Sequence, residues 1–248
     1  MTQTMAEMRT VLVTGAGRGL GRALALHLAA PGVLLFLHYN RSADGARETS
    51  ALARQKGAQT VLLEADLSRS GECSRLAEQA AGHAACLHLL IHNAGAYPES
   101  GLLELPPGAW DETLGVTLSG VYHLTRAALP LLRGAAGEGG GHPARVILIG
   151  DSGADRIVAR DFATPYHIAK VGAHILMRSF ARVLTPEGIT VNQISPGFLE
   201  NSVGEVPLIP AGRPGGFADI TGALDYLLSP AADYVSGANL VVSGGWNL

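Results

Sequence analysis

The segment Thr14-Gly15-Ala16-Gly17-Arg18-Gly19-Leu20-Gly21 follows the apolar run Val11–Val13 and precedes the helical pattern Arg22–Leu28. A strand that turns through glycines directly into a helix presents backbone N–H groups and the positive end of the helix dipole to an anion. Glycines also permit positive φ values and the close approach of a pyrophosphate, which any Cβ would obstruct. The spacing is G-x-x-x-G-x-G, because Leu20 stands where the G-x-G-x-x-G fingerprint has its last glycine. We expect this turn to bind a dinucleotide through Gly15, Arg18, Gly19, Leu20 and Gly21.

Bulk composition predicts one soluble domain over residues 1–248. A chain of 248 residues with 47% hydrophobic content can bury a full core. A net charge of −3 with scattered Lys and Arg argues against a nucleic-acid partner. No apolar run approaches the ~20 residues of a membrane span, and Met1–Arg9 lacks the apolar core of a signal peptide. Cys73 and Cys86 lack metal-ligand spacing, so we expect free thiols, no metal and a cytoplasmic location.

Short apolar runs alternate with amphipathic stretches along the chain, which is typical of βαβ units. The pattern predicts a Rossmann-type, doubly wound α/β fold, with a seven-stranded parallel sheet and helices on both faces. Ligands of such sheets bind beyond the carboxyl ends of the strands. The glycine-rich stretch Gly134–Pro143 is expected to be a surface loop. The expected strands are Thr10–Val13, Val33–His38, Thr60–Glu64, Leu87–His92, Arg145–Ile149, Thr190–Ile194 and Asn239–Val242, and the expected helices are Leu20–Ala29, Ala43–Lys56, Arg69–Ala81, Trp110–Leu132, Pro165–Leu184 and Phe217–Leu228.

Tyr166-His167-Ile168-Ala169-Lys170 opens a long predicted helix. Tyr166 and Lys170 lie at i and i+4, on one face and about a turn apart. An ammonium beside a phenol favours the phenolate, which lowers the tyrosine pKa from its ordinary value of about 10. Such a tyrosine can act as an acid or base nearer neutral pH. The spacing alone is also consistent with an ordinary pair on a helix surface.

Further motifs accompany this pair: the glycine turn, Asn93-Ala94-Gly95 after the fourth strand and Pro196-Gly197 after the sixth. With them, essentially the whole chain resembles the short-chain dehydrogenase/reductase family. The resemblance implies hydride transfer from a nicotinamide, with Tyr166 exchanging the substrate proton and Lys170 binding the nicotinamide ribose. It also implies cofactor contacts from Asp66, Leu67, Asn93, Ala94, Gly95, Tyr166, Lys170, Pro196 and Gly197.

Two positions depart from the family pattern. The chain reads Ile149-Gly150-Asp151-Ser152 where the family places its usual serine, so that Asp151 stands at the expected position. If the match to the family pattern is shifted by one residue, Ser152 takes the place of the usual serine instead. Thr117 stands where the family often carries an asparagine that holds a water relay. We take Asp151, Tyr166 and Lys170 as the catalytic residues.

The second strand ends in Leu37-His38-Tyr39-Asn40-Arg41-Ser42, which contains no carboxylate. A carboxylate here would accept the ribose hydroxyls of NAD and repel a 2′-phosphate. Arg41 and Ser42 can instead pair with that phosphate and hydrogen-bond it, with Asn40 beside them and Arg18 on the same side. The segment therefore predicts NADPH as the cofactor.

The same segment also resembles the H-Y-x-R-S stretch of pteridine reductases and dihydromonapterin reductases. That subgroup carries Asp after the fifth strand and an aromatic residue that stacks on the pterin, for which Asp151 and Tyr97 are the candidates. A carboxylate suits the donor-bearing edge of a pterin, and an aromatic face suits its ring. We therefore expect Tyr97, Asp151 and Tyr166 to bind the substrate. The match is incomplete, because Asp151 precedes Tyr166 by more residues than usual and Gly95 replaces a frequent serine.

The sequence thus favours an NADPH-dependent reductase of a C=N or C=O bond, with a pterin or dihydropterin as substrate. One alternative is a general carbonyl or 3-oxoacyl ketoreductase. Another is an NADP(H)-binding regulatory protein without turnover. The resemblance suggests a homo-oligomer, a dimer or tetramer, built on the helices Trp110–Leu132 and Pro165–Leu184. Small molecules are the other partners expected, with no nucleic acid and no membrane.

Overall fold

A seven-stranded parallel sheet forms the centre of the protein, in the order β3-β2-β1-β4-β5-β6-β7. The computed structural model describes residues 9–137, 143–202 and 207–246. From β1 the chain builds outward to β3, returns to the other side of β1 and continues from β4 to β7. This order confirms the predicted doubly wound α/β fold. The strands are β1 (Arg9–Val13), β2 (Val33–Tyr39), β3 (Gln59–Glu64), β4 (Leu89–His92), β5 (Ala144–Ile149), β6 (Ile189–Pro196) and β7 (Asn239–Val242).

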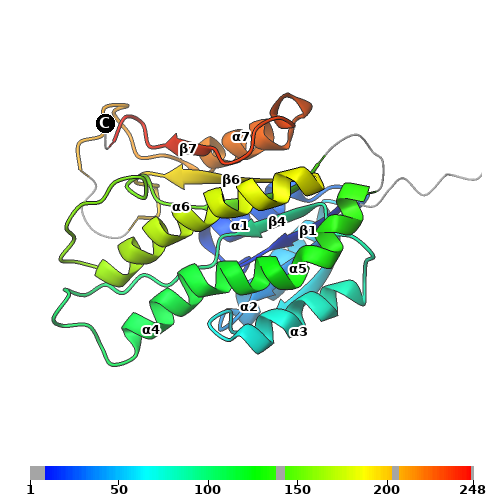
Figure 1. The fold of residues 1–248 in the computed structure, drawn as a ribbon, viewed down its shortest axis with the longest axis horizontal. Coiled ribbons are helices and arrows are strands. Elements are labelled where there is room, and N and C mark those ends of the chain that lie inside the picture. The colour runs from blue at the N-terminus through cyan, green and yellow to red at the C-terminus, as the bar shows by residue number, and fades with distance from the viewer. Residues whose placement is uncertain (1–8, 138–142, 203–206, 247–248) are drawn as a thin grey trace, which may run out of the picture.

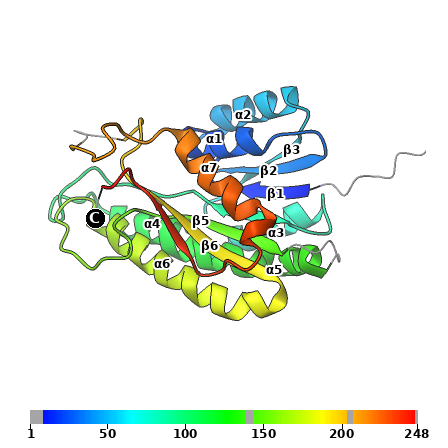
Figure 2. The same ribbon diagram turned by 90° about the horizontal axis from the view of Figure 1, so that it is seen from above.

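Helices cover both faces of the sheet (Figure 1). Three of them, α3, α5 and α6, pack on one face, while α1, α2 and α7 pack on the other (Figure 2). The loops after β4, β5 and β6 gather at the left end of the view in Figure 1. The helices are α1 (Gly19–Leu28), α2 (Ala43–Gln55), α3 (Ser70–Ala81), α4 (Ala109–Leu114), α5 (Gly120–Gly137), α6 (Thr164–Leu184) and α7 (Phe217–Leu228), with the short turns η1 (Gly115–Ser119), η2 (Thr185–Glu187) and η3 (Pro230–Ala232).

Strand side chains alternate between two apolar cores, because successive residues of a strand point to opposite faces. On β1, Leu12 packs in the cluster under α3, α5 and α6, whereas Val11 and Val13 pack in the cluster under α1 and α7. All three side chains are almost fully buried. Because both faces of the sheet are covered, the carboxyl ends of the strands are where polar side chains can meet a ligand.

The helix expected over Trp110–Leu132 is interrupted. Between α4 and α5 lies η1, a π-helical turn. A Cβ on Gly115 would lie 2.8 Å from Ser68 Cβ, and one on Gly120 would lie 2.8 Å from Leu67 O. These glycines let the helix pack closely on the segment after β3. The hydrophobic pattern predicts the helix but not this turn, and such turns are frequent at functional sites.

The loop expected over Gly134–Pro143 begins later than the pattern predicts. Helix α5 continues to Gly137, and β5 begins at Ala144. Residues 138–142, like residues 1–8 of the N-terminal segment, lie outside the described residues. Within the described ranges, no helix is long and apolar enough to cross a membrane. Cys73 and Cys86 are buried and form no disulfide.

Gly21→Ala should destabilise the protein, because the new Cβ would lie 2.2 Å from Gly15 O and 2.4 Å from Asn93 Nδ2. Overpacking of this kind costs about 1–3 kcal/mol. The matched control is Gly222→Ala in α7, where a Cβ meets nothing within 4 Å. Alanine there favours the helix by about 1 kcal/mol. Thermal melts should show a lower Tm for the first variant and an equal or higher Tm for the second, and an unchanged Tm for Gly21→Ala would contradict the close packing.

Candidate active site

The carboxyl ends of β1 and β4 meet where the strand order reverses, and a polar bridge ties them together. The hydroxyl of Thr14 donates to Ile91 O at 3.2 Å and accepts the backbone N–H groups of Asn93 and Ala94 at 2.9 and 3.0 Å. The side-chain amide of Asn93 donates to Thr14 O at 2.9 Å. The predicted residues Asn93, Ala94 and Gly95 therefore follow β4 directly beside the glycine turn.

The glycine turn has the backbone conformation that its sequence predicts. Gly15 and Gly19 have φ values of 66° and 52°, in the left-handed region that favours glycine. Helix α1 begins immediately afterwards, and its N-cap Arg18 provides no side-chain hydrogen bond. No side chain thus caps the first amides of α1, including those of Leu20 and Gly21, and an anion can take that place.

His38 braces this turn, although the sequence predicts no separate role for it. Its Nδ1 accepts the backbone N–H of Gly15 at 3.1 Å, and its Nε2 lies 3.0 Å from Ala65 O. Because an amide can only donate, the ring must carry its proton on Nε2 and donate to that carbonyl. Burial lowers the pKa of His38 to about 4, so the ring is neutral at pH 7. A histidine inside an apolar strand resembles an ordinary core residue, which hides this role from sequence reasoning.

The start of α2 packs against the glycine turn. A Cβ on Gly17 would lie 2.9 Å from Ser42 O, and one on Gly45 would lie 2.3 Å from Gly17 O. The guanidinium of Arg22 on α1 donates to Gly17 O at 2.9 Å and to Glu48 on α2 at 2.8 Å. Ser42 is therefore held next to the turn, as the prediction of a phosphate contact requires.

The other residues predicted to select the cofactor are exposed. Arg18, Asn40 and Arg41 all lie on the surface beside the turn. The guanidinium of Arg41 pairs with the carboxylate of Glu112 on α4 at 3.1 Å. The structure places Arg41 and Ser42 at one edge of the turn, and their contact with a 2′-phosphate stays a prediction.

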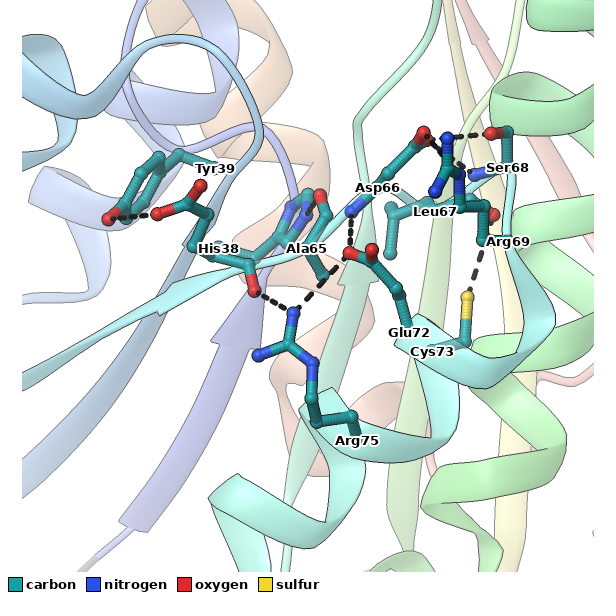
Figure 3. Close-up of polar contacts among 11 residues, drawn as sticks. His38, Tyr39, Ala65, Asp66, Leu67, Ser68, Arg69, Glu72, Cys73 and Arg75 are labelled. Atoms are coloured by element: carbon teal, nitrogen blue, oxygen red, sulfur yellow. Dashed lines mark hydrogen bonds and ion pairs between the residues drawn. The ribbon is translucent and has the colours of Figure 1, made fainter.

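Asp66 lies in the loop after β3, where its carboxylate is held by its own neighbours (Figure 3). It accepts the backbone N–H of Ser68 at 3.0 Å and the Ser68 hydroxyl at 2.7 Å, and it pairs with Arg69 at 3.4 Å. Partial burial raises the pKa of Asp66, but the hydrogen bonds from Ser68 and the charges of Arg69 and Arg41 lower it overall. Asp66 is thus an ionised loop residue above the buried Leu67, and the adenine contact of both stays a prediction.

Helix α6 starts from a strained residue that fixes its first turn. Ala163 has a φ of 50° and is fully buried; among the described residues it is the only non-glycine residue with positive φ. Its N–H donates to Ser100 O at 3.0 Å, and an isolated bridge pairs Phe162 with Gly101. The loops after β4 and β5 therefore hold each other where Tyr166 begins its turn.

Tyr166 and Lys170 lie together at the start of α6, as the sequence predicts. The Lys170 Nζ lies 5.4 Å from the centre of the Tyr166 ring and donates to Ile149 O, at the end of β5, at 2.5 Å. Tyr97, from the loop after β4, meets Tyr166 edge to face, with ring centres 4.8 Å apart. The predicted catalytic pair and the predicted substrate-contacting aromatic residue therefore share one site.

The electrostatics of this pair differ from the expectation. Burial raises the pKa of Tyr166 well above its ordinary value, and Asp151 and Tyr97 raise it further. Burial lowers the pKa of Lys170 to about 8, with Asp151 opposing the shift. The expected lowering of the tyrosine pKa is wrong for the protein alone, because burial dominates and the ammonium is engaged by Ile149 O. Tyr166 therefore carries its proton at neutral pH.

Asp151 follows β5 and belongs to the same cluster. Its negative charge raises the pKa values of Tyr97, Tyr166 and Lys170. One carboxylate oxygen accepts the N–H of Gly153 at 2.8 Å, which fixes the direction of the side chain. Asp151 and Lys170 both line a cavity of about 240 Å³. The third predicted catalytic residue is therefore brought to the predicted pair.

Ser152, the alternative to Asp151, is only 6% exposed and does not line that cavity. Its backbone N–H donates to Pro196 O at 3.0 Å, which ties the loop after β5 to the end of β6. Gly197 follows, and a Cβ there would lie 2.8 Å from Ser243 Cβ. The Pro196-Gly197 segment thus lies beside the catalytic loop, as expected for a cofactor contact that stays a prediction.

Thr117, which departs from the family pattern, has a structural partner. It is buried in η1, and its hydroxyl accepts the backbone N–H of Ala96 at 3.1 Å. A Cβ on Gly95 would lie 3.5 Å from the same hydroxyl. Thr117 therefore supports the loop that carries Gly95 and Tyr97.

A dinucleotide fits this edge of the sheet. The first turn of α1 is uncapped, and a Cβ built on Gly19 has only the Asn201 side chain within 4 Å, at 3.5 Å. A ligand backbone can therefore approach the turn as closely as a pyrophosphate requires. Across the described ranges, no cluster of His, Cys, Asp and Glu could hold a metal ion.

Comparison with known proteins agrees with this geometry. The family model described as enoyl-(acyl carrier protein) reductase matches residues 15–247. The 3-oxoacyl-[acyl-carrier-protein] reductase FabG of Staphylococcus aureus is 29% identical over 252 residues, covering 97% of this chain and 99% of that protein.

Solved structures with the same fold are also similar to this chain over nearly its whole length. The RhlG/NADP active-site complex of Pseudomonas aeruginosa superposes with a TM-score of 0.86 at 29% identity, covering 98% of each chain. A short-chain dehydrogenase/reductase of Serratia marcescens superposes with a TM-score of 0.85 at 28% identity, covering 99% of this chain and 100% of the other. None of these relatives supports the pteridine reductase subgroup. The fold, the glycine turn, the Tyr166–Lys170 pair and the matched family model together show that this chain belongs to the short-chain dehydrogenase/reductase family of oxidoreductases.

Proposed function

We propose that the protein is an NADPH-dependent carbonyl reductase. The observation that carries this proposal is the convergence of Tyr166, Lys170 and Asp151 at the start of α6 and the end of β5. The relatives favour this ketoreductase alternative over the pterin substrate that the sequence favours, because FabG acts on a 3-oxoacyl carrier protein. A regulatory protein without turnover would have no need for the clustered, buried acid and amine.

The cofactor would supply a hydride to the carbonyl carbon. Tyr166 keeps its proton in its buried position and can give it to the carbonyl oxygen as negative charge develops there. Lys170 lies over the tyrosine ring and is fixed by Ile149 O, so its charge can stabilise the phenolate that forms. The products are an alcohol and the oxidised cofactor.

The edge formed by Arg18, Arg41 and Ser42 supports NADPH over NADH. No carboxylate ends β2, and two guanidinium groups lie beside the turn on the exposed surface. Glu112 holds Arg41 in a surface ion pair with 81% of the arginine side chain exposed, so a phosphate can displace it at little cost. RhlG, which shares the fold, was solved with NADP.

A dihydropterin is the second candidate substrate. Asp151 replaces a serine next to Tyr166, and Tyr97 presents an exposed aromatic ring at the same site. A carboxylate can accept hydrogen bonds from the amino edge of a pterin, which a serine hydroxyl does less well.

We infer that the protein forms a dimer or tetramer through α5 and α6. Large apolar side chains on these helices are exposed in the single chain, namely Tyr122, Ile175 and Val183. Two neighbouring helices with such an outer face are suited to packing against a second copy.

Cofactor choice can be tested by fluorescence titration of NADPH and NADH. NADPH should bind the wild type at least tenfold more tightly, a difference of about 1.4 kcal/mol. Arg41→Asp should narrow or reverse that preference, because it removes a cation and adds a charge that repels the 2′-phosphate. Glu112→Gln is the matched control and should not weaken NADPH binding, since it only releases Arg41. Equal dissociation constants for both cofactors in the wild type would contradict the proposal.

Tyr166→Phe removes the transferable proton and keeps the ring, so kcat should fall by about 10²–10⁴-fold while NADPH still binds. Lys170→Ala should weaken both NADPH binding and turnover, because the amine is predicted to serve both. Initial rates of NADPH oxidation with acetoacetyl thioester measure turnover, and fluorescence titration measures binding. A near-normal rate in Tyr166→Phe would assign proton donation to another group.

The identity of the third catalytic residue separates the two substrate classes. Asp151→Ala should lower kcat/KM about 100-fold, equal to about 2.7 kcal/mol of transition-state stabilisation, while buried Ser152→Ala costs far less. Asp151→Ser should keep or increase reduction of acetoacetyl thioester and should abolish any reduction of dihydropterin. A near-normal kcat/KM for Asp151→Ala, together with an inactive Ser152→Ala variant, would show that Ser152 is the third catalytic residue.

A further inference from the structure

The cavity of about 240 Å³ beside the catalytic residues lies between the loop after β5 and the first turns of α6. Asp151 and Lys170 line it together with His167. Its volume corresponds to about eight water molecules at ~30 Å³ each, below the ~300 Å³ at which drug-sized pockets begin. The cavity therefore has room for a small chemical group.

Cationic groups dominate the charged lining of this cavity. Arg156, Arg160 and Lys170 contribute positive charge, against the single carboxylate of Asp151 among the lining residues. Burial lowers the pKa of His167, so the ring adds no positive charge at neutral pH. The apolar part of the lining comes from Ile157, Val158, Ile168 and Val171. Such a lining favours an anion with a short apolar body.

Arg160 lines the cavity together with Asp151 and Lys170, and its charge acts on two neighbouring rings. Burial is the largest influence on the pKa values of Tyr97 and His167, and the positive charge of Arg160 lowers both values. The charge of Arg160 therefore acts on the ring of Tyr97, which contacts Tyr166, and on His167, which lines the cavity. Arg156 pairs loosely with Asp155 at 3.9 Å, whereas no described carboxylate pairs with Arg160.

The loop that carries Arg160 is held at both ends. Near its start, the Ser152 N–H donates to Pro196 O at 3.0 Å. Near its end, the Leu102 N–H donates to Asp161 O at 2.8 Å, and Phe162 pairs with Gly101. Arg160 directly precedes Asp161, whose carbonyl is fixed by this hydrogen bond. The fixed backbone reduces the entropic cost of ordering the Arg160 side chain around a ligand.

We propose that Arg160 is a specificity-determining residue that binds an oxyacid group, carboxylate or phosphate, on the substrate. The proposal rests on the proposed reductase function and names its substrate class, a small anionic ketone. Guanidinium groups bind both oxyacids through paired, charge-assisted hydrogen bonds. The substrate would thus be a free acid or a phosphate ester, in contrast to the carrier-linked thioester of FabG.

Pairs of ketones with and without a charged oxyacid group test this proposal. Acetoacetate is compared with methyl acetoacetate for the carboxylate, and dihydroxyacetone phosphate with dihydroxyacetone for the phosphate. The wild type should show a kcat/KM at least tenfold higher for the charged member of one pair, and that pair identifies the oxyacid. Equal values in both pairs, or a preference for the neutral members, would overturn the proposal.

Arg160→Met should abolish the preference through a higher KM for the charged ketone, and it should leave the neutral ketone within twofold. Arg160→Lys should recover part of the preference, because it restores the charge without the paired donors. The control is Lys56→Met, which removes an equal charge from the exposed end of α2, outside the cavity lining. An equal fall for charged and neutral ketones in Arg160→Met would indicate a structural role and would overturn the proposal.

Measurements of ligand binding test this inference independently of the proposed function. Calorimetry with the Tyr166→Phe variant and saturating NADPH should detect binding of acetoacetate or dihydroxyacetone phosphate. The heat of binding should disappear in the double variant that also carries Arg160→Met. Binding that depends on Arg160, without wild-type turnover of any of the four ketones, would support the anion site and contradict the reductase proposal. The absence of binding by both anions would overturn the anion site, whatever the turnover.

Discussion

The hydrogen-bond bridge between Thr14 and Asn93 is the constraint on which the rest of the site depends. β1 and β4 are far apart in sequence, and each leads into a different part of the site. β1 leads into the glycine turn at the start of α1, and β4 leads into the loop that carries Tyr97. One hydroxyl and one amide join the two strand ends through hydrogen bonds of 2.9–3.2 Å. Without them, the two loops would lose their fixed relation, because the ladder of the parallel sheet ends at these residues.

Burial and the charge of Asp151 set the protonation states at the second half of the site. A tyrosine whose pKa is raised by burial and by Asp151 holds its proton until an acceptor develops negative charge. Lys170, with a pKa of about 8, is mostly protonated at pH 7 and lies over the same ring. Burial thus disfavours the phenolate form of Tyr166 in the protein alone. In the family pattern a neutral serine stands at position 151, so the carboxylate changes the charge of the site.

The sequence predicts the fold and the residues of the site better than it predicts their electrostatics. Apolar runs locate the strands, because a parallel sheet covered on both faces needs continuous apolar segments, and the strand ends then locate Asp151 and Asn93. The spacing of Tyr166 and Lys170 predicts their proximity correctly, but it carries no information on burial, which reverses the expected shift of the tyrosine pKa. The π-helical turn at Thr117 and the brace at His38 depend on contacts between distant segments, so no local pattern reveals them. Arg160 was not predicted for the same reason, since its role depends on how the loop after β5 lies against α6.

The neutral ring of His38 has a consequence for the behaviour of the protein in acid. Its pKa is about 4 in the folded protein, and the buried His92 at the end of β4 has a pKa of about 3, also lowered mainly by burial. In an unfolded chain both rings would take up a proton near pH 6.5. The unfolded state therefore binds more protons than the folded state below that pH. The stability that these rings contribute is present above pH 6.5 and is lost as the pH falls towards 4 and 3. His38 accepts the N–H of Gly15 in the glycine turn, and His92 directly precedes Asn93 of the Thr14–Asn93 bridge, so acidification weakens the edge of the sheet at which these two segments meet.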